Sequence, residues 1–388
     1  MHLCDVTAER HLRQRDIMIV VTVNSGSTSV KLGAYELTPD AEPKRIASAH
    51  HPVGHSTPSA ARRPLLQEFL AQLRPDAVAH RVVHGGTRFT RPTRIDETVL
   101  TQLGELSELA PLHNPTALSW IEAAKQVCSP DVVQVAAFDT AFFADLPRVA
   151  SEYAVAPHIG TDHGVRRYGF HGLAHEAMLR RWQQRHAELS GGGRLITLQL
   201  GGGCSVAAIS GGRPLDTSMG FSPLEGLVMA TRCGDIDAAV VPHLQRRLAR
   251  SGDEIVESLN REAGLAGLAG ASGELSSLLS TEDPRARFAV DLYCYRARKY
   301  IGGYLTVLGG CDGIVFGGGV GEHVPAIRAQ ILTGMQWAGI ELDAAANGAC
   351  RGQEGRIALS KSRVCVEVIP VDEDQALTAA ARAVLGFP

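Results

Sequence analysis

The chain has 388 residues, of which 45% are hydrophobic and 20% charged, with 38 basic against 41 acidic side chains. This length exceeds one ordinary hydrophobic core and suits two domains. The near balance of charge argues against a nucleic-acid-binding protein, and the lack of an apolar run of about 18 residues argues against a membrane span. The eight cysteines are scattered without a C-x-x-C pair, which favours reduced thiols in a cytoplasm over cysteine-bound zinc.

The first 17 residues mix acidic and arginine side chains and lack the apolar centre of a signal peptide. We therefore expect a disordered leader at 1–17. The fold is expected to begin near Met18.

Two β-branched runs flank a turn of Asn24, Gly26 and small hydroxyl side chains in residues 18–37. This pattern predicts a hairpin whose tip presents backbone N–H and side-chain O–H donors to a phosphate. Residues 195–209 repeat the plan, because Gly202-x-x-Ser205 echoes the earlier Gly-x-x-Ser spacing. The repeat predicts two matching domains.

The remaining elements follow from hydrophobic period and turn residues. In the first half we expect strands at 45–53, 77–86 and 132–138, a loop at 54–58, and helices at 62–73, 97–110 and 114–128, the last with Asn114 as N-cap. The segment 145–172 lacks a clear period and is expected to cross into the second domain. There we expect helices at 235–250, 253–262, 284–308 and 322–337, strands at 312–316 and 364–371, and a last helix at 372–385.

Charged side chains stand at the ends of two expected strands. Arg81 shares one strand face with Val83, and Asp139 directly follows a buried apolar run. Because strand ends of α/β sheets commonly border the ligand crevice, both residues indicate a site. Arg232, taken alone, is more typical of a surface arginine.

Glycines and histidines offer weaker signals. Gly317-x-Gly319-x-Gly321 lies between an expected strand and helix, a geometry that suits either an anion or a tight turn, and its spacing is not a dinucleotide-binding fingerprint. His80 and His84 lie about 13 Å apart on a strand and cannot chelate one metal. His171 and His175 lack the glutamate of a zinc-protease helix. No Gly-x-Ser-x-Gly elbow indicates a hydrolase.

Together, eight blocks in order resemble the acetate kinase (acetokinase) family over nearly the whole chain from Met18. The blocks are Val23–Lys31, His80–Gly86, Leu109–Pro115, Phe138–Phe142, Arg167–Gly172, Thr217–Gly226, Thr231–Gly234 and Gly317–Glu322.

The resemblance implies an α/β, two-domain actin-like/sugar-kinase (ribonuclease H-like) fold with a duplicated β-sheet core. It places an acyl-kinase domain at 18–150 plus the C-terminal helix 374–388, and a nucleotide-binding and dimerisation domain at 151–373. It implies reversible, direct in-line transfer of the γ-phosphoryl of ATP to acetate, with Mg²⁺ (or Mn²⁺), in a homodimer. The partners implied are small-molecule substrates, with neither nucleic acid nor membrane.

The resemblance also assigns site residues. Arg81, Asp139, His171 and Arg232 are implied to be catalytic, and Asn24 and Glu373 to handle the metal. The acyl pocket is matched by Val83, Leu112, His113, Phe170 and Pro223. The nucleotide side is matched by Ser27, Ser29, Lys31, Gln199, Gly201, Gly202, Gly203, Glu274, Leu275, Ser276, Gly317, Gly318, Gly319 and Val320.

Departures from the family pattern cluster on the donor side. Gln199 and Gly202 replace a family His and Asn, and Glu274-Leu275-Ser276 replaces Asp-Phe-Arg, losing the ring and the flat guanidinium near adenine. Alternatives to acetate kinase activity are therefore a propionate or short-chain acyl kinase, another phosphoryl donor such as a different nucleotide or pyrophosphate, and a non-catalytic sensor on the same fold. Retention of the implied catalytic residues speaks against the sensor.

Overall fold

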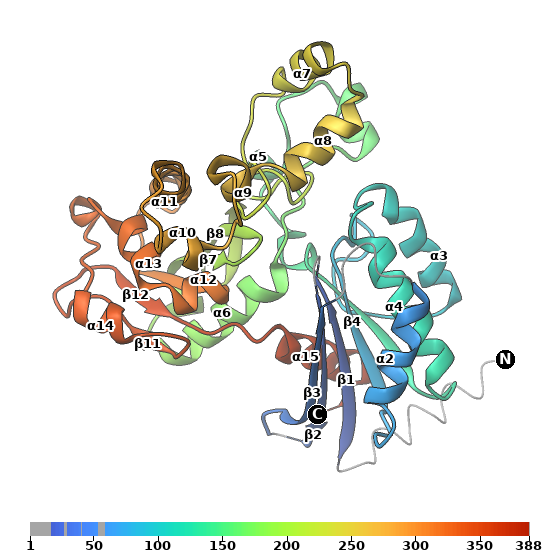
Figure 1. Cartoon of the computed structure of the whole chain (residues 1–388). Helices are drawn as coiled ribbons and strands as arrows, with labels where there is room; N and C mark the ends of the chain where they lie inside the picture. Colours follow the sequence, from blue (N-terminus) through green and yellow to red (C-terminus); the bar gives the residue numbers. More distant parts are fainter. Residues whose placement is uncertain (1–16, 27–28, 40, 53–58, 388) are drawn as a thin grey trace. The chain divides into compact units, whose positions relative to one another are not determined.

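The computed structural model describes residues 17–26, 29–39, 41–52 and 59–387. The chain divides into two compact units (Figure 1): unit 1 comprises Met1–Ala144 and Asp372–Pro388, and unit 2 comprises Asp145–Val371. The first observed boundary follows Ala144, whereas 150/151 was expected, and the second follows Val371, whereas 373/374 was expected. Glu373 therefore belongs to unit 1 and not to unit 2. The leader at 1–16, the loop at 54–58 and Ser27 lie outside the described residues.

Unit 1 is built on a six-stranded sheet with the order β3-β2-β1-β4-β6-β5. Its strands are β1 (Met18–Ser25), β2 (Ser29–Leu37), β3 (Lys44–Pro52), β4 (Ala77–Val82), β5 (Thr93–Arg94) and β6 (Val133–Phe138). β1 and β2 are antiparallel with Asn24 opposite Lys31, which confirms the first predicted hairpin. β1, β4 and β6 run parallel.

Helices cover both faces of the unit 1 sheet (Figure 1). The helices are α2 (Arg62–Phe69), α3 (Glu97–Glu105), α4 (Asn114–Val127) and α15 (Glu373–Leu385). Leu66 of α2 and Trp120 of α4 pack in one apolar cluster with Val21 and Val23 of β1. Residues that alternate with these on β1 point to the opposite face, where α15 packs against β1, β4 and β6.

Unit 2 repeats this topology around a second six-stranded sheet, ordered β11-β12-β10-β7-β8-β9. Its strands are β7 (Arg194–Leu200), β8 (Cys204–Ser210), β9 (Arg213–Thr217), β10 (Gly313–Gly317), β11 (Gly355–Arg356) and β12 (Cys365–Val368). In both sheets an antiparallel three-stranded meander continues into two parallel strands and a short antiparallel edge strand. The duplicated core predicted from the two hairpins is confirmed.

The helices of unit 2 include two that pack on its sheet, α6 (Gly172–Arg185) and α11 (Pro284–Val307). Ser205 bonds to α6 and the preceding Cys204 bonds to Tyr293 of α11, so the two helices lie on opposite faces. The others are α5 (Arg148–Ser151), α7 (Val240–Leu248), α8 (Gly252–Arg261), α9 (Gly264–Ala269), α10 (Leu275–Leu279), α12 (Gly318–His323), α13 (Pro325–Leu332) and α14 (Ala344–Ala349).

Four helix predictions were wrong in part. α2 ends at Phe69 and α3 at Glu105, short of the expected 73 and 110. The helix expected at 235–250 starts only at Val240, because the Asp235 carboxylate bonds to the Gly226 N–H and the Tyr300 hydroxyl instead of starting a helix.

The helix expected at 322–337 is divided at Pro325, since proline has no N–H to continue the ladder and forces Val324 out of helical geometry. The long helix at 284–308 was predicted almost to the residue. Across the part of the chain that the structure describes, no helix combines the length and apolar character needed to cross a bilayer.

Candidate active site

The centre of the unit 1 site is the guanidinium of Arg81. Its Nε and Nη2 donate to the carboxylate of Asp139 at 3.0 and 2.7 Å, and its Nη1 donates to Glu373 Oε2 at 3.0 Å and to Asn24 Oδ1 at 3.2 Å. Asn24 Nδ2 donates to the same Glu373 oxygen at 2.8 Å. The structure therefore brings four of the predicted site residues into one hydrogen-bonded array.

Sheet topology explains this convergence. Asn24 stands near the end of β1, Arg81 near the end of β4, and Asp139 directly after β6. Because these three strands are parallel neighbours, their carboxyl ends meet at one edge of the sheet. Glu373 is the first residue of α15, so the helix that returns from unit 2 adds the fourth side chain.

The array holds Arg81 charged. Burial alone would lower the pKa of Arg81, but the carboxylates of Asp139 and Glu373 outweigh burial and raise it. Asp139 is almost fully buried and receives both prongs of the guanidinium, the geometry that best compensates a buried ion pair. The fork is thus fixed in direction before any ligand binds.

Other predicted residues of unit 1 lie on β2, just after β4 and just before α4. Val83 and His84 follow β4, and both are buried. The N-cap prediction for Asn114 was wrong: Asn114 is the first residue of α4, and its side chain clamps the backbone of His84 from both sides at 3.1 and 3.0 Å. Leu112 and His113 lie just before α4 and are half-buried, while Lys31 on β2 is exposed and Ser29 half-buried.

In unit 2, His171 occupies a strained position at the start of α6. Its backbone adopts φ 58°, a left-handed conformation rare for residues with a Cβ. Strain of this kind costs on the order of 1 kcal/mol or more and is concentrated at functional sites. It aims the imidazole at Gly203, in the turn between β7 and β8.

Gly203 is where His171 and Arg232 converge. A methyl group added to Gly203 would stand 3.3 Å from His171 Nε2 and 3.5 Å from Arg232 Nη1. The missing side chain leaves a small space that is bordered by the Cε1–Nε2 edge of His171 and by Arg232 Nη1. A ring nitrogen and a guanidinium around one point suit the oxygens of a phosphoryl group.

Arg232 is held from behind by unit 2 itself. Its Nη1 donates to the backbone carbonyl of Pro223 at 3.2 Å, which links it to a residue predicted for the acyl pocket. Burial lowers the pKa of Arg232, since removing the cation from water disfavours its charged form. Phe170, directly before His171, is also fully buried.

The predicted nucleotide residues of unit 2 lie on three segments, of which the start of α12 adjoins β7, since Gly318 packs against Gln199 and Leu200. Gly201, Gly202 and Gly203 make the turn of the second hairpin, and Gln199 carries a buried Oε1 that has no hydrogen-bond partner among the described residues. Leu275 packs into the interior of the unit, while Ser276 Oγ bonds to Glu274 at the exposed surface.

The glycine loop expected after β10 is instead the first turn of the short helix α12, and the Gly318 N–H already donates to Glu322 Oε1 at 2.9 Å. Gly317 ends β10, Gly319 is exposed and Val320 half-buried. The anion site expected there loses one of its backbone donors, because a carboxylate of the same chain occupies it.

Sequence reasoning missed the residue behind His171. Ser205 on β8 receives or donates a hydrogen bond at 2.9 Å from His171 Nδ1. Its place in the repeated Gly-x-x-Ser spacing was the only signal, and that spacing indicated a phosphate turn. The alternation of the strand, which turns Ser205 toward α6, could have indicated the contact.

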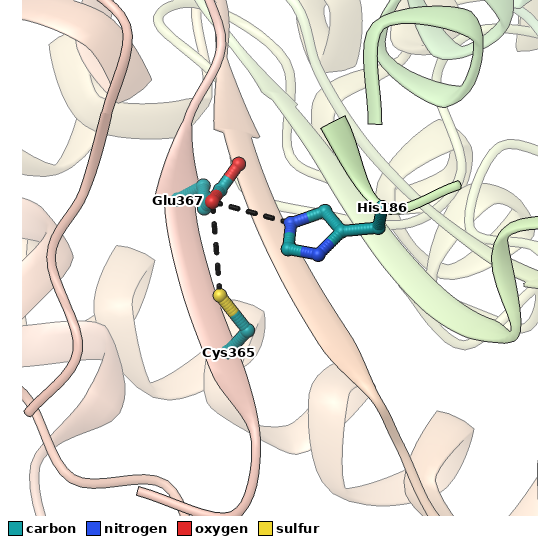
Figure 2. A group of neighbouring side chains, drawn as sticks. All are labelled: His186, Cys365 and Glu367. Atoms are coloured by element: carbon teal, nitrogen blue, oxygen red, sulfur yellow. Dashed lines mark hydrogen bonds and ion pairs between the residues drawn. The ribbon is translucent and has the colours of Figure 1, made fainter. Parts of the chain in front are cut away.

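A second polar cluster joins α6 to β12 (Figure 2). His186, Cys365 and Glu367 could supply metal ligands by residue type. However, Arg185 Nε donates to Glu367 at 2.9 Å and His186 Nε2 lies 3.2 Å from the same carboxylate. Burial raises the pKa of Cys365 to about 11, so its thiol stays protonated. The cluster is an ion-pair anchor between two elements.

Comparison with known proteins decides the family. A sequence profile of the Acetokinase family matches residues 64–379, most of the chain. The chain belongs to the acetokinase family. It is 44% identical to the acetate kinase of Chloroherpeton thalassium over 303 residues, which cover 77% of this chain and 73% of that protein. It is 40% identical to the acetate kinase of Streptomyces coelicolor over 387 residues, covering 92% and 94%.

Solved structures of acetokinase relatives agree. The acetate kinase of Porphyromonas gingivalis superposes with a TM-score of 0.83 at 33% identity, covering 95% of this chain and all of that one. A propionate kinase from Francisella tularensis superposes at 0.82 with 29% identity, covering 94% and 98%. The predicted family and the two-domain actin-like/sugar-kinase fold are confirmed. The protein is a kinase, of a family that uses ATP as co-substrate.

Proposed function

We propose that this kinase transfers the γ-phosphoryl group of ATP to the carboxylate of acetate, reversibly and by direct in-line displacement, to give acetyl phosphate. The observation that carries the proposal is that His171 Nε2 and Arg232 Nη1 both border the position where a side chain of Gly203 would stand. Two donors aimed at one space suit the equatorial oxygens of a transferring phosphoryl group.

The reaction needs charge neutralisation more than proton transfer. A carboxylic acid with a pKa near ~4 is almost fully ionised at neutral pH, so a general base has little to do. The barrier comes from one anion attacking another. Fixed positive groups lower that barrier without reorganisation, and Arg81 and Arg232 are both pre-positioned by their own units.

The residues Asn24 and Glu373 fit a magnesium ion. Both offer hard oxygen atoms, and Glu373 Oε1 has no hydrogen bond recorded in the described part of the chain. Mg²⁺ (or Mn²⁺) commonly binds through one or two carboxylates together with substrate phosphates, and it would supply neutralisation of phosphate charge. Arg81 would keep the Asn24 and Glu373 side chains oriented.

The roles of the two units divide accordingly in this proposal. Unit 1 supplies Arg81, Asp139 and the metal-handling pair, with Val83 and Leu112 toward the acyl group. Unit 2 supplies His171 and Arg232, with Phe170 and Pro223 toward the acyl group and the hairpin glycines toward the nucleotide. The homodimer implied by family resemblance stays a prediction, which sedimentation of the purified protein would test.

A second candidate concerns the donor. Gln199 has a buried, unsatisfied Oε1, and Gly202 is open on its Cβ side, where the family pattern has a His and an Asn. These features favour a weak and unselective nucleotide site that accepts other triphosphates or pyrophosphate. A propionate acceptor is the other variant, since one structural relative is named a propionate kinase.

A hydroxamate assay with a panel of donors and of acetate, propionate and butyrate tests the proposal. We expect ATP-dependent acetyl phosphate formation that Arg232→Ala reduces by roughly a hundredfold or more, because a transition-state donor is lost. The matched control is Arg261→Ala, which removes an exposed arginine paired with Glu257 in the same unit. Absence of product with every donor and acceptor would overturn the proposed function.

A further inference from the structure

A chain of three hydrogen-bonded side chains leads to Nδ1 of the His171 imidazole. Thr197 Oγ1 lies 2.7 Å from His175 Nδ1, His175 Nε2 lies 2.8 Å from Ser205 Oγ, and Ser205 Oγ lies 2.9 Å from His171 Nδ1. Thr197, His175 and Ser205 are fully buried. They come from β7, α6 and β8, so three elements of unit 2 build one continuous hydrogen-bonded path.

The hydrogens along this path can be counted. Burial, reinforced by the nearby His171, lowers the pKa of His175 well below its ordinary value, so the ring is neutral with one N–H. Thr197 and Ser205 each carry one hydroxyl hydrogen. Each contact needs one hydrogen, so the path can run in either of two directions. In a third arrangement His175 Nε2–H and His171 Nδ1–H both donate to Ser205, but the buried Ser205 O–H then has no acceptor recorded among the described residues.

In the first direction Thr197 O–H donates to His175 Nδ1, His175 Nε2–H donates to Ser205, and Ser205 O–H donates to His171 Nδ1. In the second direction every bond is reversed, and His171 Nδ1–H donates into the path. The Thr197 hydroxyl then needs another acceptor. Its only hydrogen bond recorded in the described residues is the one with His175, so the reversed path buries an unsatisfied O–H.

We propose that Thr197, His175 and Ser205 are positioning residues that keep the proton of neutral His171 on Nε2, the nitrogen that faces Gly203. The inference deepens the proposed function: the catalytic role of the Nε2–H donor rests on the proposed phosphoryl transfer. His171, whenever its ring is neutral, then offers the Nε2–H as a hydrogen-bond donor to the transferring phosphoryl group. No proton is transferred along the path, and no bond in it is broken during the reaction.

The direct test is the ring tautomer of His171, read from two-bond ¹⁵N–¹H correlations of the full chain labelled with ¹⁵N-histidine at a pH where the rings are neutral. The His171→Gln spectrum assigns the signal by its loss. We expect a protonated Nε2 and a bare Nδ1 at His171, and the same tautomer at His175. A protonated Nδ1 at neutral His171 overturns the inference.

A matched pair of variants tests the origin of the direction. Thr197→Val keeps the shape but removes the hydroxyl, and Thr197→Ser keeps the hydroxyl. We expect the valine variant to show a mixture of His171 tautomers and a turnover reduced roughly two- to fivefold, with KM for acetate and ATP unchanged, because only a transition-state donor is diluted. The serine variant should restore the wild-type tautomer and turnover.

If Thr197→Val gives the same His171 spectrum and the same turnover as wild type, the proposed role of Thr197 is overturned. The melting temperature of each variant separates loss of folding from loss of the tautomer. The spectrum is recorded without substrate, so its result does not depend on whether the protein has the proposed activity. A bare Nδ1 at His171 in a protein that makes no acyl phosphate would overturn the proposed function and leave the tautomer intact.

Discussion

Asn24 Nδ2 donates to Oε2 of Glu373, a residue 349 positions further along the chain, at 2.8 Å. The bond ties the end of β1 to the first turn of α15. Arg81 Nη1 donates to both side chains, so an amide, a carboxylate and a guanidinium fix one another. The C-terminal helix is therefore part of the unit 1 site.

Replacing Arg81 by alanine should lower turnover by about 10²–10³-fold, because a fixed transition-state cation is lost. Arg81→Lys should recover little, since an ammonium cannot form the planar fork to Asp139. Steady-state kinetics of purified variants provide the measurement. Arg88→Ala, which removes an exposed partner of Glu105, is the control and should stay near wild type.

Arg81→Ala should also lower the stability of the fold, an effect that must be distinguished from the loss of turnover. Without Arg81, the buried Asp139 carboxylate loses the guanidinium that forms its ion pair, which costs about 3–5 kcal/mol. Asp139→Asn added to Arg81→Ala should raise the melting temperature without restoring turnover. Turnover within about tenfold of wild type for Arg81→Ala would contradict the catalytic role.

Stability should fall in mild acid because of two buried histidines in unit 1. Burial lowers the pKa of His80 and of His84 to about 4, partly offset at His80 by its bond to Gln134. The unfolded chain takes up these protons near pH ~6.5, so the stabilisation is complete above that pH and is lost as pH falls toward the folded values.

Between pH 6.5 and 5 each histidine contributes a loss of ~2 kcal/mol. The pKa of Asp374, raised to about 6 by burial and by Asp372, acts in the opposite direction and returns ~1 kcal/mol. Urea unfolding at pH 7.5 and 5 should show a net loss of at least about 2–3 kcal/mol, because the buried His175 of unit 2, whose pKa is also lowered, adds to the loss. His80→Gln should reduce that loss, and an equal or greater free energy of unfolding at pH 5 would refute the assignment.

The sequence predicted the parts of this fold that local patterns determine. Both hairpins, the buried strand before Asp139 and the long helix α11 follow from apolar period and turn residues. The helix ends were less predictable: Asp235 looks like a helix start, but its carboxylate bonds to Gly226 and Tyr300. Long-range partners of a side chain override its local preference.

The site was predictable only in pieces. Arg81 and Asp139 were predicted from their positions at the ends of expected strands, whereas Glu373 and His171 were assigned only by resemblance to the family. Strand alternation could indicate that Ser205 faces α6, but not that it bonds to both His171 and His175, because that pairing depends on how α6 packs on β8. Likewise, the sequence predicted an open glycine loop after β10. It could not show that the Gly318 N–H is already bonded to the carboxylate of Glu322, a residue of the same short helix α12.

The acyl pocket should widen in Val83→Ala. Val83 is nearly buried beside the arginine array, and loss of its methyl groups makes room for one more methylene, worth ~1 kcal/mol. We expect the ratio of kcat/KM for propionate to that for acetate to rise about fivefold. The neighbouring Val82→Ala, which opens the cluster around Phe138 instead, should leave that ratio unchanged. An unchanged ratio in Val83→Ala would place the acyl methyl elsewhere.

The donor site should be weak and unselective, and Gly202→Asn should improve it. A Cβ on Gly202 meets nothing within 4 Å, so the fold has room for the family residue. One hydrogen bond to a charged phosphate is worth roughly 1.5–3 kcal/mol, so KM for ATP should fall about tenfold. In wild type, GTP should be accepted within about tenfold of ATP. Rejection of GTP by wild type at roughly a hundredfold or more would contradict this prediction.

Two adjacent glycines give the sharpest test of the unit 2 site. A methyl group on Gly203 would stand 3.3 Å from His171 Nε2 and 3.5 Å from Arg232 Nη1, whereas one on Gly202 meets only open space. Gly203→Ala therefore fills the space between the two side chains and presses most closely on His171. Because the methyl group takes the space proposed for a phosphoryl oxygen, turnover should fall by about an order of magnitude or more.

Gly202→Ala is the matched control, with the same change one residue away in the same turn. It should keep turnover within about twofold, since it touches neither His171 nor Arg232. Neither glycine has a positive φ, so alanine fits both backbones and the two melting temperatures should agree within a few degrees. If Gly203→Ala retains wild-type turnover, the transferring phosphoryl group does not lie between these two donors.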